Sequence, residues 1–384
     1  MNKNETLNNG PLKNIKVLDL TTVVMGPSAT QCLGDLGAEI IKVEHPSGDS
    51  MRLIGPFKND GMGPLFLLAN RNKKSITLDL KKQEHKKLLI ELASKVDVVV
   101  SNIRPSALER LGISYESISK VNSKIIFCSA VGYGSAGPLA GNAVYDDLMQ
   151  AASGISGLFR AIDGRPRYAP INICDRIVGL YVVIAITSAL HHLNQTGEGQ
   201  EIEVPMYETM TQFVLSDHMG GAVFSPQIGS MGYKRLLSTT RGPYPTLDGD
   251  LSIVVYTNAH WKAFLKIVDD EGLMEKDSRF VSQESRTQNA IEIGKYLADK
   301  LKSKSNFEWL TILKEADIPA SPVNSIEDLL SDKHLEDVNF FHHISHPTEG
   351  NLKVPKFPIQ FSKSPASIRL HPPTIGENNL EFNV

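Results

Sequence analysis

The sequence has little cysteine, with only three such residues in 384, at Cys32, Cys128 and Cys174. They are widely spaced and odd in number, and no Cys-x-x-Cys pair occurs. This usage excludes a disulfide framework and a cysteine zinc site as the basis of the fold. The histidine-rich stretch "HHISH" at 342–346 has no further ligands beside it, so we expect solvated or loop histidines there and no metal.

An excess of charge of either sign is also lacking. The chain has 40 Lys and Arg residues against 43 Asp and Glu, which gives a net charge of −3 and a pI near 6.4. No basic excess indicates a nucleic-acid partner, and no long basic run indicates a membrane surface. The first residues are polar and do not resemble a secretory signal, so the sequence favours a reduced, cytoplasmic protein.

Long hydrophobic runs are absent as well. The longest apolar run, 177–190, contains Gly179, Tyr181, Thr187 and Ser188, and it falls short of a membrane-spanning segment. We expect this run to form a buried helix. The hydrophobic content of 41% is ample for a core, and the length of 384 residues suggests two domains.

The familiar nucleotide-binding loops are not found where they would be expected. No GxxxxGK[ST] motif occurs, and the first predicted strand–helix turn, "VVMGPSAT" at 23–30, lacks GxGxxG. A P-loop or a dinucleotide-binding turn at this place is therefore not favoured. The helix start near Pro27 could bind an anion through free amides, and an ordinary turn explains the same residues equally well.

What the sequence does contain is an alternation of strands and helices. "IKVLDLT" at 15–21 predicts a strand, followed by a small-residue helix ending near Gly37 and a second strand, "AEIIKVE", at 38–44. Such a strand–helix–strand unit implies parallel pairing. Further strands are expected at 74–80, 96–102 and 124–132, and a helix at 82–95. The pattern predicts an α/β fold with a helix-covered parallel sheet, whose ligands bind beyond the carboxyl ends of the strands.

The composition changes after the stretch "EIEVPMYETM". Residues 213–245 are rich in Gly, Ser and Pro, and a strand pattern, "LSIVVYT", and several helix patterns such as "FEWLTILKEA" follow. We therefore expect a second, smaller α+β domain at 213–325.

Two arginines follow one of the buried strand patterns. In "SNIRPSALERLG" at 101–112, Arg104 and Arg110 come directly after "VDVVV". The strand exit is where α/β sheets bind ligands, and arginine suits phosphate recognition through its fork of donors. The spacing alone is equally consistent with two ordinary surface arginines.

One carboxylate precedes the longest apolar segment. Asp175 lies between Cys174 and Arg176, and three interpretations are open. It can cap the following helix, although Val178 stands where a capping box needs Glu or Gln. It can form an ion pair with Arg176, or it can act as a catalytic base or nucleophile in apolar surroundings. Cys174 is an alternative nucleophile, but no positioned histidine accompanies it.

Taken together, seven stretches resemble the class III CoA-transferases, the formyl-CoA and carnitine CoA-transferase (CaiB/BaiF) family. The resemblance covers residues 11–370, and its markers occur in the family's order. They are "VLDLTTVVMGPSATQCLGDLGAEIIKVEHPSGD", "NRNKKSITLDLK", "SNIRPSALERLGISYESI", "GYGSAGPLAGNAVYDDLMQAASGISGL", "DRIVGLYVVIAITSALHHLNQTGEGQEIEVPMYE", "RGPYPTLDG" and "IPASPVNSIEDLLSD".

The resemblance implies a particular architecture. The family has a large Rossmann-like domain and a smaller α+β domain, and two subunits interlock as rings. We therefore expect a homodimer in which 1–212, completed by 326–384, forms the large CoA-binding domain and 213–325 the small one. The sequence by itself could not show interlocking.

The resemblance also implies that Asp175 is the nucleophile of a CoA-transferase, in an Asp-x-x-x-Gly pattern completed by Gly179. Its carboxylate attacks an acyl-CoA thioester, and CoA then passes through an enzyme thioester to a second carboxylic acid. No metal, ATP or tightly bound cofactor is needed, because the thioester free energy passes between acids. Succinyl-CoA or another short acyl-CoA is the expected donor. Glycines at 220–221 or 229–232 are candidate oxyanion donors.

The family's CoA-contacting segments carry over residue by residue. Arg110 is the best phosphate candidate. Val24 replaces a polar residue of formyl-CoA transferases, which speaks against formate or oxalate as substrate, and His45 replaces a CoA-contacting arginine. The implied CoA-binding residues are Val24, Met25, His45, Leu78, Lys81, Asn102, Ile103, Arg104, Arg110, Asn142 and Tyr145.

Two other functions stay open within the resemblance. The related 2-methylacyl-CoA racemases use the same aspartate as a base, together with a histidine in a motif similar to "HDINY". Here Tyr145 stands in place of that histidine, and a tyrosine of ordinary pKa is a poor partner for two-base racemisation. A catalytically dead CoA-binding subunit is the third possibility, and the retention of Asp175 argues against it.

Overall fold

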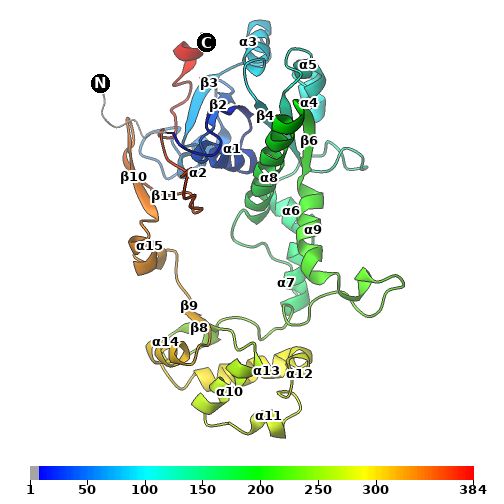
Figure 1. Ribbon diagram of the computed structural model, residues 1–384, viewed down its shortest axis with the longest axis vertical. Coiled ribbons are helices and arrows are strands. Elements are labelled where there is room, and N and C mark those ends of the chain that lie inside the picture. The colour runs from blue at the N-terminus through cyan, green and yellow to red at the C-terminus, as the bar shows by residue number, and fades with distance from the viewer. Residues whose placement is uncertain (1–7) are drawn as a thin grey trace. The chain divides into compact units, whose positions relative to one another are not determined.

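The computed structural model describes residues 8–384 and divides into two compact units (Figure 1). The large unit comprises the described residues up to Ile155, together with Tyr168–Phe213 and Glu336–Val384. The small unit comprises Ser156–Arg167 and Val214–Leu335. The sequence-based domain limits, which place 156–167 and 326–335 in the large domain, stay a prediction.

The large unit is built on a six-stranded parallel sheet with the strand order β3-β2-β1-β4-β5-β6. This order reverses direction between β1 and β4, and ligands of such sheets bind at that point, beyond the carboxyl ends of the strands. The strands are β1 (Lys16–Leu20), β2 (Glu39–Glu44), β3 (Lys73–Thr77), β4 (Val98–Ser101), β5 (Ile126–Val131) and β6 (Gln200–Pro205). The predicted α/β class is confirmed.

Helices cover both faces of this sheet (Figure 1). On one face, α1 (Met25–Asp35) and α8 (Ile173–Thr196) share a core with Val98 and Val100. On the other face, α3 (Gln83–Ala93), α4 (Pro105–Leu111) and α5 (Tyr115–Ser119) share a core with Val99 and Phe127. The alternation of Val98, Val99 and Val100 between the two cores is the period of two that strand geometry imposes.

Helix α8 corrects one expectation. It is 24 residues long, extends well beyond the apolar run at 177–190, and by length and composition alone could cross a membrane. Only 33% of its most apolar window is buried, so the prediction of a buried helix is wrong for much of its surface. Cys174, Val178 and Val182 face the core, whereas Leu180 is 56% and Ile184 58% exposed.

The C-terminal segment packs beside the edge strand β3. A hairpin of β10 (Phe341–His346) and β11 (Gly350–Pro355) begins it. The Asn72 side chain donates to the Ser367 carbonyl (2.9 Å) and accepts from the Arg369 amide (2.6 Å). The Ser75 amide donates to Asn378 Oδ1 at 3.0 Å. These bonds tie the end of the chain to a sheet that begins near its start.

The small unit has its own aromatic core. Three short antiparallel strands, β7 (Tyr244–Pro245), β8 (Asp250–Ile253) and β9 (Ala320–Pro322), pair in that order. Trp261, Phe264 and Trp309 are almost completely buried within it. Among its helices are α10 (Asn258–Ile267), α11 (Leu273–Lys276), α12 (Gln283–Gln288), α13 (Ala290–Leu301) and α14 (Asn306–Glu315). The other elements of the chain are η1 (Ser50–Leu53), α2 (Pro64–Ala69), α6 (Asp146–Ala152), α7 (Ile155–Asp163), α9 (Met206–His218), η2 (Gly220–Val223), η3 (Asp328–Leu330), α15 (Lys333–Asp337) and η4 (Asn379–Phe382).

Candidate active site

A cavity of about 450 Å³ opens in the large unit where β1, β4, β5 and β6 end. It therefore lies at the reversal point of the sheet, where the fold class places its ligands. Its lining is formed by Thr22, Val23, Met25, Asn102, Ile103, Arg104, Pro105, Ser106, Ala130, Val131, Gly132, Tyr133, Ser135, Ala140, Gly141, Asn142, Ala143, Val144, Tyr145, Asp175, Glu203 and Met206.

Asp175 lines this cavity from the first turn of α8. Burial, reinforced by the negative charge of Asp146 and opposed by Arg176, raises the pKa of Asp175 to about 7. Within residues 8–384, its carboxylate accepts no hydrogen bond and forms no ion pair. The cavity thus contains a half-buried carboxyl group that changes charge near neutral pH, as a nucleophile or base requires.

The structure overturns the capping interpretation of Asp175. Asn172 occupies the N-cap position, and Asp175 itself lies inside the helix. The Asp175 amide is satisfied from outside, because it donates to Asp146 Oδ1 at 2.9 Å. The ion-pair interpretation also fails, since Arg176 Nη1 points to Ser28 Oγ at 2.7 Å. The Asp175 carboxylate is therefore free of the two structural roles that the sequence allowed.

Two buried residues of α6, Asp146 and Gln150, hold the start of α8 in place through hydrogen bonds. Neither was predicted from the sequence. Asp146 Oδ2 accepts from Gln150 Nε2 at 2.7 Å, one helical turn away. Gln150 Oε1 in turn accepts from the Ala169 amide at 2.8 Å, in the segment that leads into α8. The only signal in the sequence is a polar pair spaced four residues apart, which looks like any exposed helix face.

Gly179 has a packing role in the Asp-x-x-x-Gly pattern. It lies one turn after Asp175, and a Cβ atom at this position would come within 2.9 Å of the Met25 carbonyl oxygen. The absence of a side chain therefore lets α8 cross the first turn of α1 at backbone contact. That crossing brings Asp175 beside the turn between β1 and α1.

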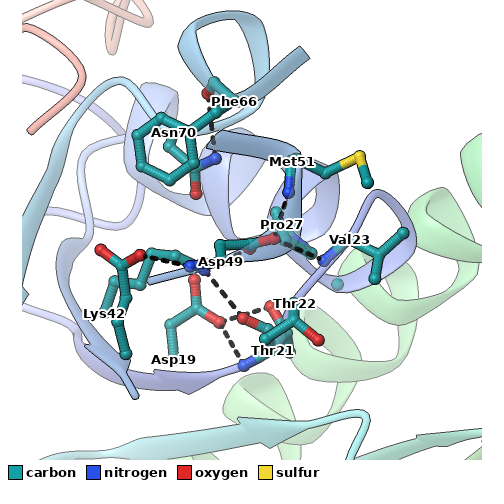
Figure 2. Close-up of polar contacts among 12 residues, drawn as sticks. Asp19, Thr21, Thr22, Val23, Pro27, Lys42, Asp49, Met51, Phe66 and Asn70 are labelled. Atoms are coloured by element: carbon teal, nitrogen blue, oxygen red, sulfur yellow. Dashed lines mark hydrogen bonds and ion pairs between the residues drawn. The ribbon is translucent and has the colours of Figure 1, made fainter. Parts of the chain in front are cut away.

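The turn between β1 and α1 is strained. Val23 has φ +72°, a left-handed conformation that is unfavourable for a β-branched residue. Figure 2 shows its main restraint: the Val23 amide donates to Asp49 Oδ1 at 3.2 Å. Asp49 is held in turn by Lys42, whose ammonium donates to Asp49 Oδ2 (3.2 Å) and to the Thr21 carbonyl (2.8 Å). The strained residue lines the same cavity as Asp175.

A second buried ion pair, between Lys73 and Asp19, lies beside this turn. Lys73 Nζ donates to Asp19 Oδ2 at 3.0 Å and to the Pro27 carbonyl at 3.0 Å, and both charged side chains are fully buried. Burial by itself would raise the pKa of Asp19, but the charges of Lys73 and Lys42 outweigh it and lower the pKa to about 2. Lys42 thus connects Asp49 to the Thr21 carbonyl of the turn, and Lys73 connects Asp19 of β1 to the Pro27 carbonyl in the first turn of α1.

Six of the predicted CoA-binding residues line the cavity together with Asp175. Asn102 also has a structural task, because its side chain donates to the Thr22 carbonyl (2.8 Å) and accepts from the Thr22 amide (3.1 Å). This exchange fixes the ends of β1 and β4 beside each other. The six are Met25, Asn102, Ile103, Arg104, Asn142 and Tyr145. Their binding roles stay predictions.

The other five predicted residues do not line the cavity. Val24 and Leu78 are buried in the core, at 3% and 1% exposure, because an apolar side chain next to a sheet packs inward. His45 is exposed after β2, where its Nδ1 lies 2.7 Å from Ser47 Oγ. Lys81 and Arg110 are exposed on the surface. A CoA contact from any of these five stays a prediction.

The loop after β5 also lines the cavity, and the sequence marked it only as part of the family resemblance. Residues 132–137 read Gly-Tyr-Gly-Ser-Ala-Gly directly after the strand, which matches GxGxxG, yet no helix opens there. The loop is held instead by acids of β6 and α9: the Gly134 amide donates to Glu208 and the Ser135 amide to Glu203, each at 2.9 Å. Glu203 is itself a cavity residue, and no motif of the sequence singled it out.

Two further expectations fall outside this cavity. The glycines at 220–221 and 229–232 lie in the small unit, where the Gly221 amide donates to the Ser230 carbonyl at 3.1 Å. Their role as oxyanion donors stays a prediction. The histidine-rich stretch forms β10, and His346 is 2% exposed with its Nε2 2.8 Å from the Pro372 carbonyl, so the expectation of solvated or loop histidines is wrong for His346. The part of the chain that the structure describes contains no cluster of three potential metal ligands.

The fold and the cavity define a doubly wound α/β protein with an isolated carboxylate at its ligand-binding edge. CoA-transferase family III matches residues 12–379 in a family comparison. The chain therefore belongs to CoA-transferase family III. It is 32% identical over 369 residues to succinyl-CoA:glutarate CoA-transferase of Mus musculus, covering 96% of this chain and 84% of that protein.

Other relatives agree with this assignment. Succinate–glutarate CoA-transferase of Agrobacterium fabrum is 30% identical over 380 residues, covering 97% of this chain and 94% of that protein. A solved CAIB/BAIF family protein from Brucella suis superposes with a TM-score of 0.81 at 29% identity, covering 98% of this chain and 99% of that one. The resemblance noted in the sequence is confirmed, and the protein is an enzyme of the CoA-transferase type.

Proposed function

We propose that the protein transfers CoA from an acyl-CoA donor to a carboxylic acid through covalent intermediates on Asp175. The observation that carries the proposal is the position of this carboxylate. It lines the cavity at the sheet edge, and none of the described residues engages it in a hydrogen bond or ion pair. A carboxylate kept free beside a ligand cavity is available for attack on a carbonyl carbon.

The proposed reaction balances without a cofactor. An Asp175 carboxylate oxygen attacks the thioester carbonyl, the C–S bond breaks, and CoA leaves as a thiolate from a mixed anhydride. The thiolate then attacks the Asp175 carbonyl carbon, which releases the donor acid and leaves a CoA thioester on the enzyme. The acceptor carboxylate repeats the attack, and the returning thiolate forms the new acyl-CoA and frees Asp175. No net proton is consumed.

We propose a short acyl-CoA such as succinyl-CoA as donor and a short dicarboxylic acid as acceptor. The relatives support this choice, since two of them are named for succinyl-CoA or succinate together with glutarate. Arg104 is an exposed cation on the cavity wall and suits a phosphate of CoA or a second carboxylate of the acid. The six CoA-binding candidates that line the cavity surround the same space.

We also propose that the active form is a homodimer. The exposed apolar side chains Leu180 and Ile184 lie on α8, and Ile171 before the helix is 62% exposed. Exposed apolar side chains one helical turn apart, such as Leu180 and Ile184, are typical of a surface covered by a partner. A second copy of the chain is the partner that the family relationship supports.

A racemase acting on a 2-methylacyl-CoA is the alternative, with Asp175 as one base. The cavity argues against it, because its lining contains Tyr145, 67% exposed, and no histidine among the described residues. Exchange of the α-proton of a 2-methylacyl-CoA in heavy water, without CoA transfer, would instead support this alternative.

The transferase proposal is tested by product analysis. The purified protein is incubated with succinyl-CoA and glutarate, and glutaryl-CoA formation is followed by liquid chromatography. We expect ping-pong kinetics, and a loss of more than about 1,000-fold in kcat for Asp175→Asn. Asp147→Asn, which changes an exposed acid of α6, serves as the matched control and should retain activity. Equal activity of Asp175→Asn and wild type would contradict the proposal.

A further inference from the structure

A second cavity, of about 290 Å³, lies wholly within the small unit. It is bounded by the segment before β7, by β8, and by helices α10, α12 and α13. Its lining is formed by Arg235, Ser238, Thr240, Arg241, Gly242, Pro243, Tyr244, Ser252, Ile253, Val254, Val255, Tyr256, Trp261, Gln283, Arg286, Thr287, Ala290, Ile293, Gly294 and Leu297.

The charged side chains that line this cavity are all positive. Arg235, Arg241 and Arg286 contribute to it, whereas no Asp, Glu or Lys side chain does. Arg286 is satisfied internally, because it donates to the Phe280 carbonyl and to Asn258 Oδ1, each at 2.6 Å. Arg235 and Arg241 form no ion pair with any carboxylate of residues 8–384. Two guanidinium groups without a counter-charge in one hollow create a local preference for an anion.

The two free arginines act on the same phenol. Tyr244 lies half-buried on the cavity wall; its burial raises the pKa of its hydroxyl, and the positive charges of Arg235 and Arg241 oppose that rise. Arg235 also lies over the Tyr256 ring, 5.8 Å from its centroid. Both guanidinium groups thus belong to the cavity wall and lie near enough to Tyr244 for their charges to act on it.

The segment that carries Arg241 is fixed on both sides. Thr240 Oγ1 donates to the Ala290 and Ile291 carbonyls at the start of α13, each at 3.2 Å. Gly294 makes room for this contact, since a Cβ atom there would lie 2.2 Å from Thr240 Oγ1. On the other side, Tyr244 pairs with Leu251 in the small sheet. A cation on a rigid segment loses little freedom when it binds a ligand.

The rest of the cavity suits a carbon chain rather than a bare inorganic ion. Trp261 is 1% exposed, and Ile293 and Leu297 are 8% and 5% exposed, so the floor is apolar. Hydroxyls of Ser238, Thr240 and Thr287 provide polar contacts along the walls. A site with an apolar floor and a few convergent polar groups is typical of small organic ligands.

We propose that this cavity binds a small organic acid, with its carboxylate between Arg235 and Arg241 and its carbon chain against Trp261. Arginine forks match carboxylates through paired hydrogen bonds, which explains why two of them stand here without an acidic partner. This cavity and the Asp175 cavity share no lining residue and belong to different units. Such binding goes beyond the proposed function and does not depend on the chemistry of Asp175.

The test is a binding titration on the full chain, with glutarate as the probe and inorganic phosphate as the comparison. The chain has two tryptophans, and Trp261 is the one that lines the cavity, so its fluorescence reports occupancy. We expect saturable quenching by glutarate, with the affinity reduced about tenfold or more in Arg241→Gln and Arg235→Gln. Arg241→Lys should bind weakly, since it keeps the charge but loses the fork.

Arg279→Gln is the matched control, because Arg279 is exposed and already paired with Asp277. It should bind glutarate as the wild type does. Asp175→Asn should also show unchanged quenching, so that failure of the transferase proposal and failure of this inference can be told apart. Loss of quenching in Asp175→Asn, unchanged affinity in both arginine variants, or phosphate binding as tight as glutarate binding would each overturn the inference.

Discussion

At the scale of single residues, the fold changes the acidity of one carboxyl group, that of Asp175. Asp175 loses hydration in the cavity wall and lies near the negative Asp146, and both effects hold its proton more tightly. A nucleophile must be ionised, so the raised pKa ties activity to pH. The same burial leaves the ionised form poorly solvated and therefore reactive when it does form.

The first prediction concerns that pH dependence. The rate of CoA transfer should rise with pH through an apparent pKa of about 7, the value of Asp175 in the folded protein. Asp146→Asn removes the like charge and should move this rise to lower pH. Initial rates between pH 5 and 9 for both proteins test it. A rate that does not change over this range would contradict the assigned role of Asp175.

The second prediction concerns stability. A carboxyl pKa of about 7 in the folded state, against about 3.9 in the unfolded chain, means that ionising Asp175 favours unfolding. This cost is absent below pH 4, grows as pH rises and is complete above pH 7. Asp175→Asn should therefore raise the free energy of unfolding by about 1–3 kcal/mol at pH 8, after allowance for partial exposure, and leave it unchanged at pH 4. Urea unfolding at both pH values measures the difference.

At the scale of elements, the turn between β1 and α1 stores strain beside the active-site candidate. The buried pairs of Lys42 with Asp49 and of Lys73 with Asp19 hold its two ends. A strained residue of this kind persists only where its surroundings over-determine it, at a cost of about 1–3 kcal/mol. We interpret the two lysines as restraints on the cavity wall rather than as ordinary sources of stability.

The third prediction uses a double mutant to separate restraint of the cavity wall from an ordinary contribution to stability. Asp49→Asn weakens the hold on the Val23 amide, and we expect turnover to fall about tenfold or more as the wall relaxes. Val23→Gly allows a positive φ without strain and should restore much of the turnover in the Asp49→Asn background. The measurement is the steady-state kcat of the single and double mutants, compared with that of the wild type.

A matched control for this prediction lies elsewhere in the large unit. Asp35 also forms a buried ion pair, in which its Oδ2 lies 2.6 Å from Arg71 Nη2. Neither Asp35 nor Arg71 lines the cavity. Asp35→Asn should lower stability without changing kcat of the folded enzyme. If Val23→Gly fails to restore turnover while Asp49→Asn remains folded, the restraint interpretation is wrong.

At the scale of the whole molecule, the sequence predicted most strands of the sheet but not the buried ion pairs beside them. The strands expected at 15–21, 38–44 and 96–102 contain β1, β2 and β4, because buried parallel strands have a strong apolar signature. Lys42 and Lys73 gave no such signal, since a lysine in a strand normally marks a solvated face. Their partners Asp49 and Asp19 are seven and 54 residues away, a distance that local pattern does not reach.

The candidate site shows the same limit. The family resemblance singled out Asp175, and the structure places it in the cavity with six of the eleven expected CoA-binding residues. The capping interpretation failed because α8 begins before Asp175, with Asn172 at its N-cap, and the Asp175 amide donates to Asp146, 29 residues earlier in the chain. Gly179 was noted only as part of a pattern, and its steric reason became visible with the crossing of α1 and α8.

The fourth prediction concerns the exposed face of α8. If two chains associate through it, Leu180→Asp combined with Ile184→Asp should yield a monomer, because charges would replace the apolar contact. Size-exclusion chromatography with light scattering measures the mass of wild type and variant. Leu247→Asp, which alters a 70% exposed leucine of the small unit, is the control and should not change the mass. A wild-type monomer would contradict the proposed homodimer.

The measurement that tests the central claim most directly is the capture of an intermediate on Asp175. The protein is mixed with succinyl-CoA, treated with hydroxylamine or borohydride, and digested for peptide mass spectrometry. The account predicts a hydroxamate, or a homoserine after reduction, at Asp175 alone and only when the acyl-CoA is present. An enzyme that forms glutaryl-CoA from succinyl-CoA and glutarate while Asp175 stays unmodified under both treatments would contradict it.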